Sequence, residues 1–337
     1  MAGSMRPYLE RLPRYLSMRQ MRMLAAVAEH GSVLAASRAL RVAQPSVSRT
    51  VTELENAIGV RLFDRSARGM SLTLFGEALL RRVKTIFGEL RDAEEDLRSL
   101  KEGSYGHVYV GCTRLLSAGV LPRLLSRLMR ARPGLNLSLV EADTETLLKG
   151  LRDRTFDIAL GRLPEAAGRE SDVDYELLFE EKLLIVAGTE HPMAQQDRVS
   201  LRDIPRESWG LPLANSMLYR AIKESFVRCG TPLPEPHVQA DSVDVMLELV
   251  ESGDVITLIP ASSLLEKSAR YRIRIIQPVE PLEYGPVGSM VLKDRLPTPA
   301  MTLFAEFLRA EMRVPAPRLR RAPGRRRPAQ RADALPS

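Results

Sequence analysis

A short polar cluster near position 45 carries side chains that can read the edges of nucleic-acid bases. Residues 44–49 are Gln-Pro-Ser-Val-Ser-Arg. Gln44 and Arg49 have the donors and acceptors that pair with adenine or guanine, and Pro45 can press on a thymine methyl group. Ser46 and Ser48 suit phosphate oxygens, which a helix N-terminus also attracts. The alternative interpretation is that all five are solvated surface residues.

Three short helices must position this cluster. Apolar spacing predicts a first helix over about residues 19–29, and Ser32 is placed to cap a second helix that ends near Leu40. After a turn at 41–43, a third helix opens at Gln44–Pro45, where proline is well tolerated. Two short helices, a brief turn and a third helix with a polar face are typical of a helix-turn-helix.

A basic turn follows the third helix. Residues 65–69 read Arg-Ser-Ala-Arg-Gly, and residues 70–74 alternate like a short strand. This pattern predicts a wing of two strands whose tip carries Arg65 and Arg68. Arginine is favoured in narrow minor grooves, although Arg65 could instead pair with a carboxylate of the fold.

Residues 35–79, which include AASRALRVAQPSVSRTVTELENAIGVRLFDRS, resemble the winged helix-turn-helix of LysR-type transcriptional regulators. The resemblance implies that Gln44, Pro45, Ser48, Arg49 and Arg68 contact double-stranded promoter DNA. Looser likeness, in segments such as LVESGDVITLIP, extends it to about residues 18–310. RNA polymerase is a further expected partner.

A long uninterrupted helix is expected over residues 76–103, which contain no proline. Apolar residues alternate at spacings of four and three along it, which predicts a heptad seam for pairing with a second copy. The alternative is packing against the protein's own body. The resemblance implies dimers that pair into a tetramer. The heptad seam consists of Leu79, Val83, Ile86, Leu90, Ala93, Leu97 and Leu100.

Residues 106–313 alternate strand-like and helix-like patterns, as expected of an α/β domain with a parallel sheet. The resemblance implies a two-lobed effector-binding domain built like a periplasmic substrate-binding protein, with a cleft between the lobes. The full expected organisation is an N-terminal extension (1–17), an all-α winged helix-turn-helix (18–75), a linker and dimerisation helix (76–104), an effector-binding domain (105–313, with lobe 1 about 105–180 and 286–313 and lobe 2 about 181–285) and a disordered Arg/Pro-rich tail (314–337).

Polar residues that follow strands or begin helices are the candidates for binding an effector. Ligands of open α/β sheets bind at the carboxyl ends of strands, where helix N-termini favour anions. The candidates are Thr113, Arg162, Asn215, Ser216, Asp241 and Ser242. The resemblance implies effector contacts for Thr113, Ser216 and Ser242 and hints at a sugar acid or aromatic acid, while plain N-capping is the alternative for each.

Charge is unevenly distributed. Residues 1–75 hold 11 Arg and 5 acidic residues, and residues 314–337 hold 7 Arg and one Asp, whereas the body is mildly acidic. This pattern favours a polyanion-binding module attached to a body that binds something else. Two other classes stay open: a small-molecule binding or transport protein with an incidental basic head, and a nucleoid-type structural DNA binder.

Enzymatic interpretations find little support. The sequence has no GxGxxG after a strand, no GxxxxGK[ST], no HExxH and no GxSxG. Two cysteines are too few for a disulfide framework or a four-cysteine zinc site, so no metal or other cofactor is expected. No apolar run approaches membrane-spanning length and no export signal is evident near the N-terminus. We therefore expect a cytoplasmic protein.

Overall fold

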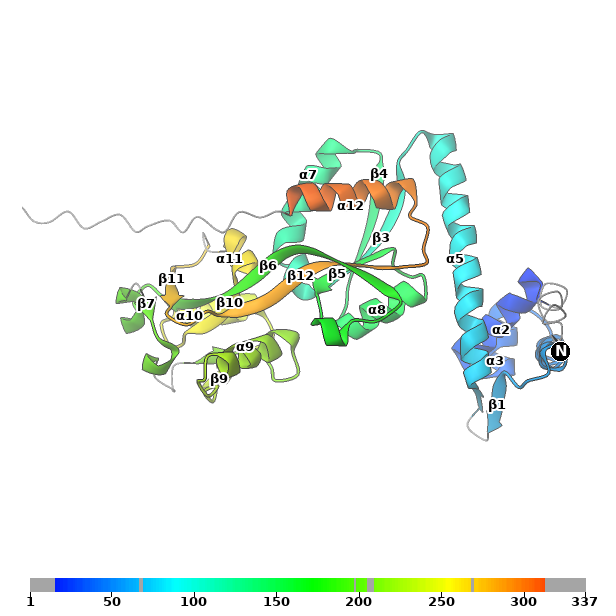
Figure 1. The fold of residues 1–337 in the computed structure, drawn as a ribbon, viewed down its shortest axis with the longest axis horizontal. Coiled ribbons are helices and arrows are strands. Elements are labelled where there is room, and N and C mark those ends of the chain that lie inside the picture. The colour runs from blue at the N-terminus through cyan, green and yellow to red at the C-terminus, as the bar shows by residue number, and fades with distance from the viewer. Residues whose placement is uncertain (1–15, 67–68, 197, 205–208, 268–269, 313–337) are drawn as a thin grey trace, which may run out of the picture. The chain divides into compact units, whose positions relative to one another are not determined.

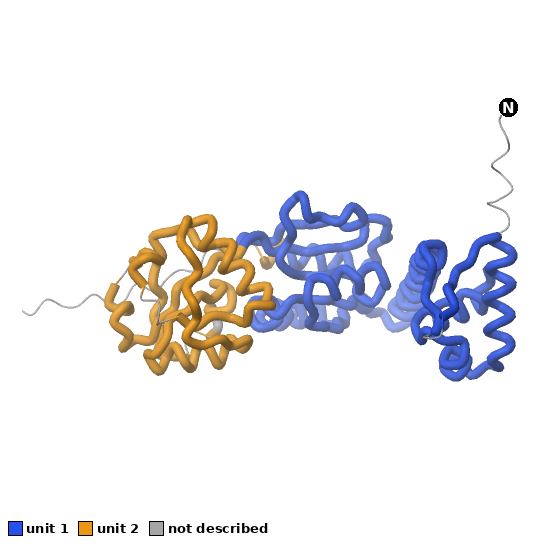
Figure 2. Tube along the Cα trace, turned by 90° about the horizontal axis from the view of Figure 1, so that it is seen from below, with its two compact units in different colours: residues 1–180, 285–308 blue, residues 181–284, 309–337 orange. Residues whose placement is uncertain are grey.

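The computed structural model describes residues 16–66, 69–196, 198–204, 209–267 and 270–312. The chain divides into two compact units (Figure 2). The described residues of the first unit fall within 1–180 and 285–308, and those of the second within 181–284 and 309–337. No described helix is long and apolar enough to cross a membrane. The expected tail, most of the N-terminal extension and Arg68 lie outside the described residues.

The N-terminal part of the first unit is a winged helix-turn-helix, as predicted (Figure 1). A capping box between Ser17 and Gln20 begins its first helix, and Ser32 caps the second by accepting from the Ala35 amide at 3.0 Å. Its core is made by the buried faces of all three helices. The elements are α2 (Met18–His30), α3 (Val33–Leu40), α4 (Gln44–Ile58) and an antiparallel wing of β1 (Phe63–Ser66) and β2 (Gly69–Leu72).

A single long helix, α5 (Leu74–Glu102), leaves this head. The Thr73 hydroxyl caps it by accepting from the Gly76 amide at 3.1 Å. Gly103 ends it with φ of 63°, a conformation that favours glycine. The helix is thus defined at both ends by local sequence, close to the predicted 76–103.

The remainder of the first unit is an α/β layer. Strands β4 (Leu135–Glu141), β3 (Gly106–Cys112) and β5 (Ile158–Arg162) are parallel, and β12 (Glu283–Leu292) pairs antiparallel with β5. The helical segment that follows β3 is divided at Gly119, whose backbone is not helical. The helices are α6 (Arg114–Ser117), α7 (Val120–Ala131), α8 (Thr144–Arg152), α12 (Pro299–Glu311) and the 3₁₀ turn η1 (Ala166–Gly168).

The second unit is built around β6 (Val173–Gly188), which begins in the first unit and pairs antiparallel with two other strands of the second. The parallel sheet expected from the apolar runs is found for β3, β4 and β5, whereas β6 and β12 add antiparallel pairs. Buried strands of either direction have continuous apolar runs, so composition alone does not separate them. The other elements are β7 (Arg198–Val199), β8 (Gly210–Leu211), β9 (Val238–Gln239), β10 (Thr257–Pro260), β11 (Ile273–Pro278), α9 (Met217–Arg228), α10 (Val243–Glu251), α11 (Ala261–Lys267), η2 (Pro192–Gln195) and η3 (Leu201–Asp203).

Candidate DNA-binding and effector sites

The N-terminal end of α4 presents the predicted base-reading residues to solvent. Gln44, Pro45 and Arg49 are exposed, and Ser46 and Ser48 are half-buried. The opposite face of α4 is apolar and fully buried against α2 and α3. Residue 43 is alanine, so no side chain of the described residues caps the first amides of α4. A helix begun this way leaves its positive end available to a phosphate.

Arg19 also belongs to this surface, although the sequence pattern did not predict it. Its Nη2 donates to the Ser46 hydroxyl at 3.4 Å, although the two residues lie on different helices. Arg19 thus places a second guanidinium beside the start of α4. Its only sequence signal was a basic residue on the polar side of the first helix.

The wing is attached to the helices by hydrogen bonds that backbone amides in and beside its strands donate. Glu55 Oε1 accepts from the Leu62 and Phe63 amides at 2.8 and 3.1 Å. The Gly31 carbonyl accepts from the Met70 amide at 2.7 Å. Arg65 was expected at the tip of the wing. It lies instead in strand β1 opposite Met70, because strand pairing continues to Ser66 and Gly69. Its side chain is exposed.

The residues of the α5 heptad seam lie in two different environments, the core of the head and the exposed surface. Val83 is completely buried in the core of the head, and Leu79 packs against that core. Val83 therefore has no surface left for a partner subunit, which corrects its assignment to a dimer contact. Ile86 and Ala93 are exposed, and Leu90, Leu97 and Leu100 are between 50% and 81% exposed. The exposed part of the heptad seam lies toward the C-terminal end of α5.

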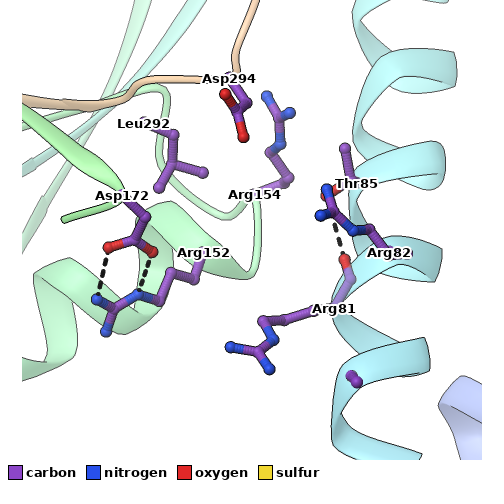
Figure 3. A pocket seen from close by; sticks show the side chains of 9 residues that line it. Arg81, Arg82, Thr85, Arg152, Arg154, Asp172, Leu292 and Asp294 are labelled. Atoms are coloured by element: carbon purple, nitrogen blue, oxygen red, sulfur yellow. Dashed lines mark hydrogen bonds and ion pairs between the residues drawn. The ribbon is translucent and has the colours of Figure 1, made fainter.

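The end of α8 carries a dense set of ion pairs. Arg152 donates to both carboxylate oxygens of Asp172, at 2.8 and 2.9 Å, and to Glu170 at 2.9 Å (Figure 3). Lys84 of α5 also pairs with Asp153. The Arg152 guanidinium holds the pKa of the Asp172 carboxyl below its usual range.

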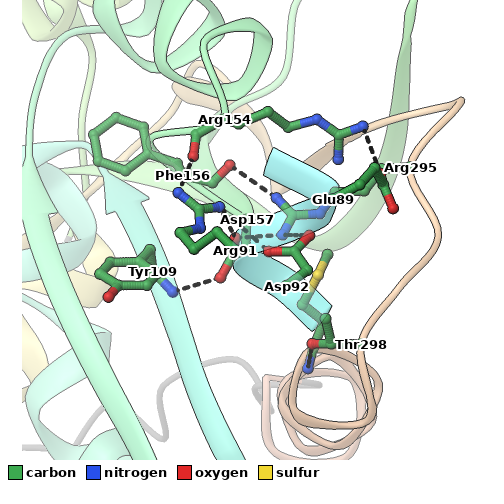
Figure 4. A network of polar contacts seen from close by, with 10 residues as sticks. Glu89, Arg91, Asp92, Tyr109, Arg154, Phe156, Asp157, Arg295 and Thr298 are labelled. Atoms are coloured by element: carbon green, nitrogen blue, oxygen red, sulfur yellow. Dashed lines mark hydrogen bonds and ion pairs between the residues drawn. The ribbon is translucent and has the colours of Figure 1, made fainter. Parts of the chain in front are cut away.

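A buried polar network attaches α5 to this α/β layer (Figure 4). Arg295, with 2% of its side chain exposed, pairs with Asp157 at 2.6 Å and with Asp92 of α5 at 2.8 Å. Asp157 also accepts from the Tyr109 amide at 2.7 Å. Arg91 of α5 donates to the Arg154 carbonyl and lies 3.5 Å from Asp157. Sequence reasoning did not identify this network, because its members are up to 203 residues apart.

In the first unit, two of the predicted effector residues lie at the carboxyl ends of neighbouring parallel strands. Thr113 comes after β3, and its amide donates to the Leu160 carbonyl of β5 at 3.0 Å. Arg162 is the last residue of β5. The Thr113 hydroxyl oxygen is buried and has no hydrogen-bond partner among the described residues. Beside it, burial raises the pKa of the Cys112 thiol to about 11, so this cysteine stays protonated at neutral pH.

In the second unit, the four remaining candidates also share one edge. Strands β8 and β9 are parallel neighbours, and each leads to the start of a helix. Ser216 caps α9 and Ser242 caps α10, accepting from the amides of residues 219 and 245 at 3.1 and 3.4 Å. Asn215 and Asp241 precede them and are exposed. Both serines therefore make the N-cap contacts that were the alternative to a ligand role.

Comparison with known proteins agrees with this arrangement. A family model described as a bacterial regulatory helix-turn-helix protein of the lysR family matches residues 18–77, and a LysR substrate binding domain model matches residues 101–313. The HTH-type transcriptional regulator GbpR of Rhizobium radiobacter is 32% identical over 235 residues, which cover 69% of this chain and 78% of that protein.

Two solved structures share the fold. Full-length CbnR in complex with its target DNA has a TM-score of 0.59 at 22% identity, covering 88% of this chain and 99% of that one. The effector binding domain of QuiR in complex with shikimate has a TM-score of 0.52 at 22% identity, covering 61% of this chain and 97% of that one. The head, the long helix and the α/β units, together with both family models, show that this chain belongs to the LysR family: it is a DNA-binding transcriptional regulator with an effector-binding domain, and not an enzyme.

Proposed function

We propose that this regulator recognises its promoter through the N-terminal end of α4, with Gln44, Pro45 and Arg49 on base edges. Ser46, Ser48 and the wing arginines Arg65 and Arg68 contact the backbone or the minor groove. The observation that carries this proposal is the exposed polar face at an uncapped helix start, opposite a fully buried apolar face. In a helix-turn-helix, this end of the recognition helix enters the major groove.

Substituting Arg49 by alanine tests the base-reading role. We expect Arg49→Ala to lose about 1–3 kcal/mol of discrimination between operator and random duplex, since a bidentate base contact supplies that much. Competition binding at fixed salt measures it. Arg22→Ala, an exposed arginine of α2, is the matched control for the loss of one positive charge. Unchanged discrimination in Arg49→Ala would remove this residue from the proposed interface.

The proposed effector is a small organic anion, of the sugar-acid or aromatic-acid type. The candidate effector-binding groups lie at strand ends and helix starts within each α/β unit: Thr113 and Arg162 in the first unit, and Asn215, Ser216, Asp241 and Ser242 in the second. The strongest support is the buried Thr113 hydroxyl that has no acceptor or donor among the described residues. Such a group costs free energy unless a ligand completes its hydrogen bond. The relative QuiR, whose effector domain was solved with shikimate, suggests a carboxylate ligand.

Thermal unfolding of the full-length chain with a panel of sugar acids and aromatic acids identifies the effector class. Thr113→Val should keep the unfolding temperature of the free protein, because it removes a hydroxyl that is already unsatisfied. It should also reduce or abolish the stabilisation by the best ligand. Thr146→Val, at an exposed threonine of α8, is the control. A full ligand response in Thr113→Val would exclude this hydroxyl from the site.

We also propose that two chains pair along the exposed part of the heptad seam, and that two such dimers form a tetramer. Two recognition helices then meet the two halves of a palindromic operator. An effector that prefers one arrangement of the assembly shifts the population toward it.

A further inference from the structure

A cavity of about 380 Å³ lies between α5 and the end of α8, entirely within the first unit (Figure 3). Its volume falls in the range of small-molecule sites. Its lining is dominated by arginines from both sides. The charged lining residues are Arg81, Arg82, Arg152, Arg154, Asp172 and Asp294.

The charges of Arg152 and Asp172 already compensate one another. Asp172 receives two hydrogen bonds from Arg152, which also binds Glu170. Arg81 and Arg82 project from α5 with exposed side chains, and neither forms an ion pair with a described residue. The cavity therefore has cationic groups available on its α5 side.

Arg154 is the unusual member of the set. Only 3% of its side chain is exposed, and its Nη2 donates to Glu89 at 3.1 Å. Its Nε and Nη1 are buried and have no hydrogen-bond partner among the described residues. Burial, with Arg295 nearby, lowers the pKa of this guanidinium. Buried cationic donors without acceptors are costly unless something supplies the missing acceptors.

Two local departures from ordinary geometry hold Arg154 in this place. Its backbone has φ of 59°, in the left-handed region that a bulky residue rarely adopts. On α5 the facing residue is Gly88, and a Cβ there would lie 2.7 Å from Arg154 Cγ. Glycine in the middle of a helix costs about 1 kcal/mol relative to alanine. The strained backbone of Arg154 and the helical glycine at position 88 thus both occur where α5 packs against the Arg154 side chain.

We propose that this cavity binds a small anion bearing a phosphate group. Arg81 and Arg82 of α5 donate to its oxygens, and the buried guanidinium of Arg154 adds positive charge to the cavity wall. A phosphate group offers several acceptor oxygens and up to two charges, which suits donors that approach from two sides better than a monocarboxylate does. A small ligand is favoured over duplex DNA because a cavity of about 380 Å³ holds a small molecule and not a double helix.

An occupant of this cavity contacts both α5 and the α/β layer. It therefore adds to the attachment of the helix that carries the DNA-binding head. This site is separate from the strand-end residues of the proposed effector site. The two sites share no residue, so a negative result at one of them does not bear on the other.

Calorimetric titration of the full-length protein tests the proposal. Inorganic phosphate and glycerol 3-phosphate are the two probes, each at an ionic strength matched with chloride, so that free and esterified phosphate are distinguished. We expect saturable binding of at least one probe. Arg81→Gln/Arg82→Gln should weaken it roughly tenfold or more, since it removes two charged donors. Arg123→Gln/Arg130→Gln, which neutralises two exposed arginines of α7, is the control and should bind as the wild type does.

A second variant addresses the buried donor. Arg154→Met should weaken binding, because it removes a positive charge from the cavity wall, while circular dichroism shows a folded chain; if that variant does not fold, the Arg81/Arg82 pair alone decides. The proposal is overturned if neither probe binds saturably to the wild type. It is equally overturned if the Arg81→Gln/Arg82→Gln protein binds no more weakly than the control.

Discussion

Glu181 illustrates how a single buried side chain sets a pH dependence. Its Oε1 accepts from the amides of Lys182 and Ser262 at 3.0 and 3.3 Å, yet its Oε2 has no partner among the described residues. Burial, only partly offset by these amides, raises the pKa of the Glu181 carboxyl. Folding thus shifts the Glu181 carboxyl toward its neutral form.

The sign of the effect follows from linkage. Below the ordinary pKa of a glutamate, the Glu181 carboxyl is protonated in both the folded and the unfolded protein, so it does not lower the free energy of unfolding. As pH rises through the raised folded pKa, its ionisation destabilises the fold. We expect Glu181→Gln to increase the free energy of unfolding at pH 7 and to leave it unchanged near pH 4. Urea unfolding at both pH values measures this, with Glu94→Gln, at an exposed site on α5, as the control. An equal effect at both pH values would contradict the argument.

At the scale of elements, the attachment of α5 depends on the buried Arg295 network. Arg295 serves two carboxylates, Asp157 and Asp92, which come from different elements. Removing one member of a buried pair leaves an uncompensated charge. Through Asp92, this network joins α5 to the α/β layer.

We expect Arg295→Met to lower the free energy of unfolding by about 3–5 kcal/mol, because both carboxylates lose their buried partner. The matched control is Arg272→Met. Arg272 also forms an ion pair, with Glu251 at 3.2 Å, but 83% of its side chain is exposed. Its loss should cost at most about 1 kcal/mol. Equal costs in chemical unfolding would show that the buried network contributes no more than a surface pair.

At the scale of the whole molecule, the proposed pairing of chains rests on the heptad seam beyond Val83. Leu90 and Leu97 are large apolar side chains left exposed on one long helix. Exposed apolar rows of this kind are typical of surfaces that pair with another subunit.

If the proposed oligomer forms along this seam, Leu90→Lys/Leu97→Lys should reduce it to smaller species, since the change places charges in the proposed interface. Sedimentation velocity measures the size. Met129→Lys/Val227→Lys changes two equally exposed apolar residues on α7 and α9 and should sediment as the wild type does. If the heptad-seam variant also sediments as the wild type does, the exposed leucines pack elsewhere or stay in solvent.

The sequence alone determined the features that local patterning controls. Capping residues, glycine stops and the 3.6-residue period located α2, α3, α4 and α5 to within a few residues. The same local logic identified the polar face that starts at Gln44. These features depend on residues within a few turns of one another, so the order of residue types is sufficient to predict them.

Only the tertiary structure decided which contacts form between distant segments. It assigned Val83 to the core of the head rather than to a partner, and it made β12 antiparallel to β5. It also buried Arg154 and Arg295 beside α5, where they form ion pairs with Glu89 and Asp92 of that helix. Apolar periodicity shows that a face will be buried, but not against what. Ion pairs between residues up to 203 positions apart leave no periodic trace in the sequence at all.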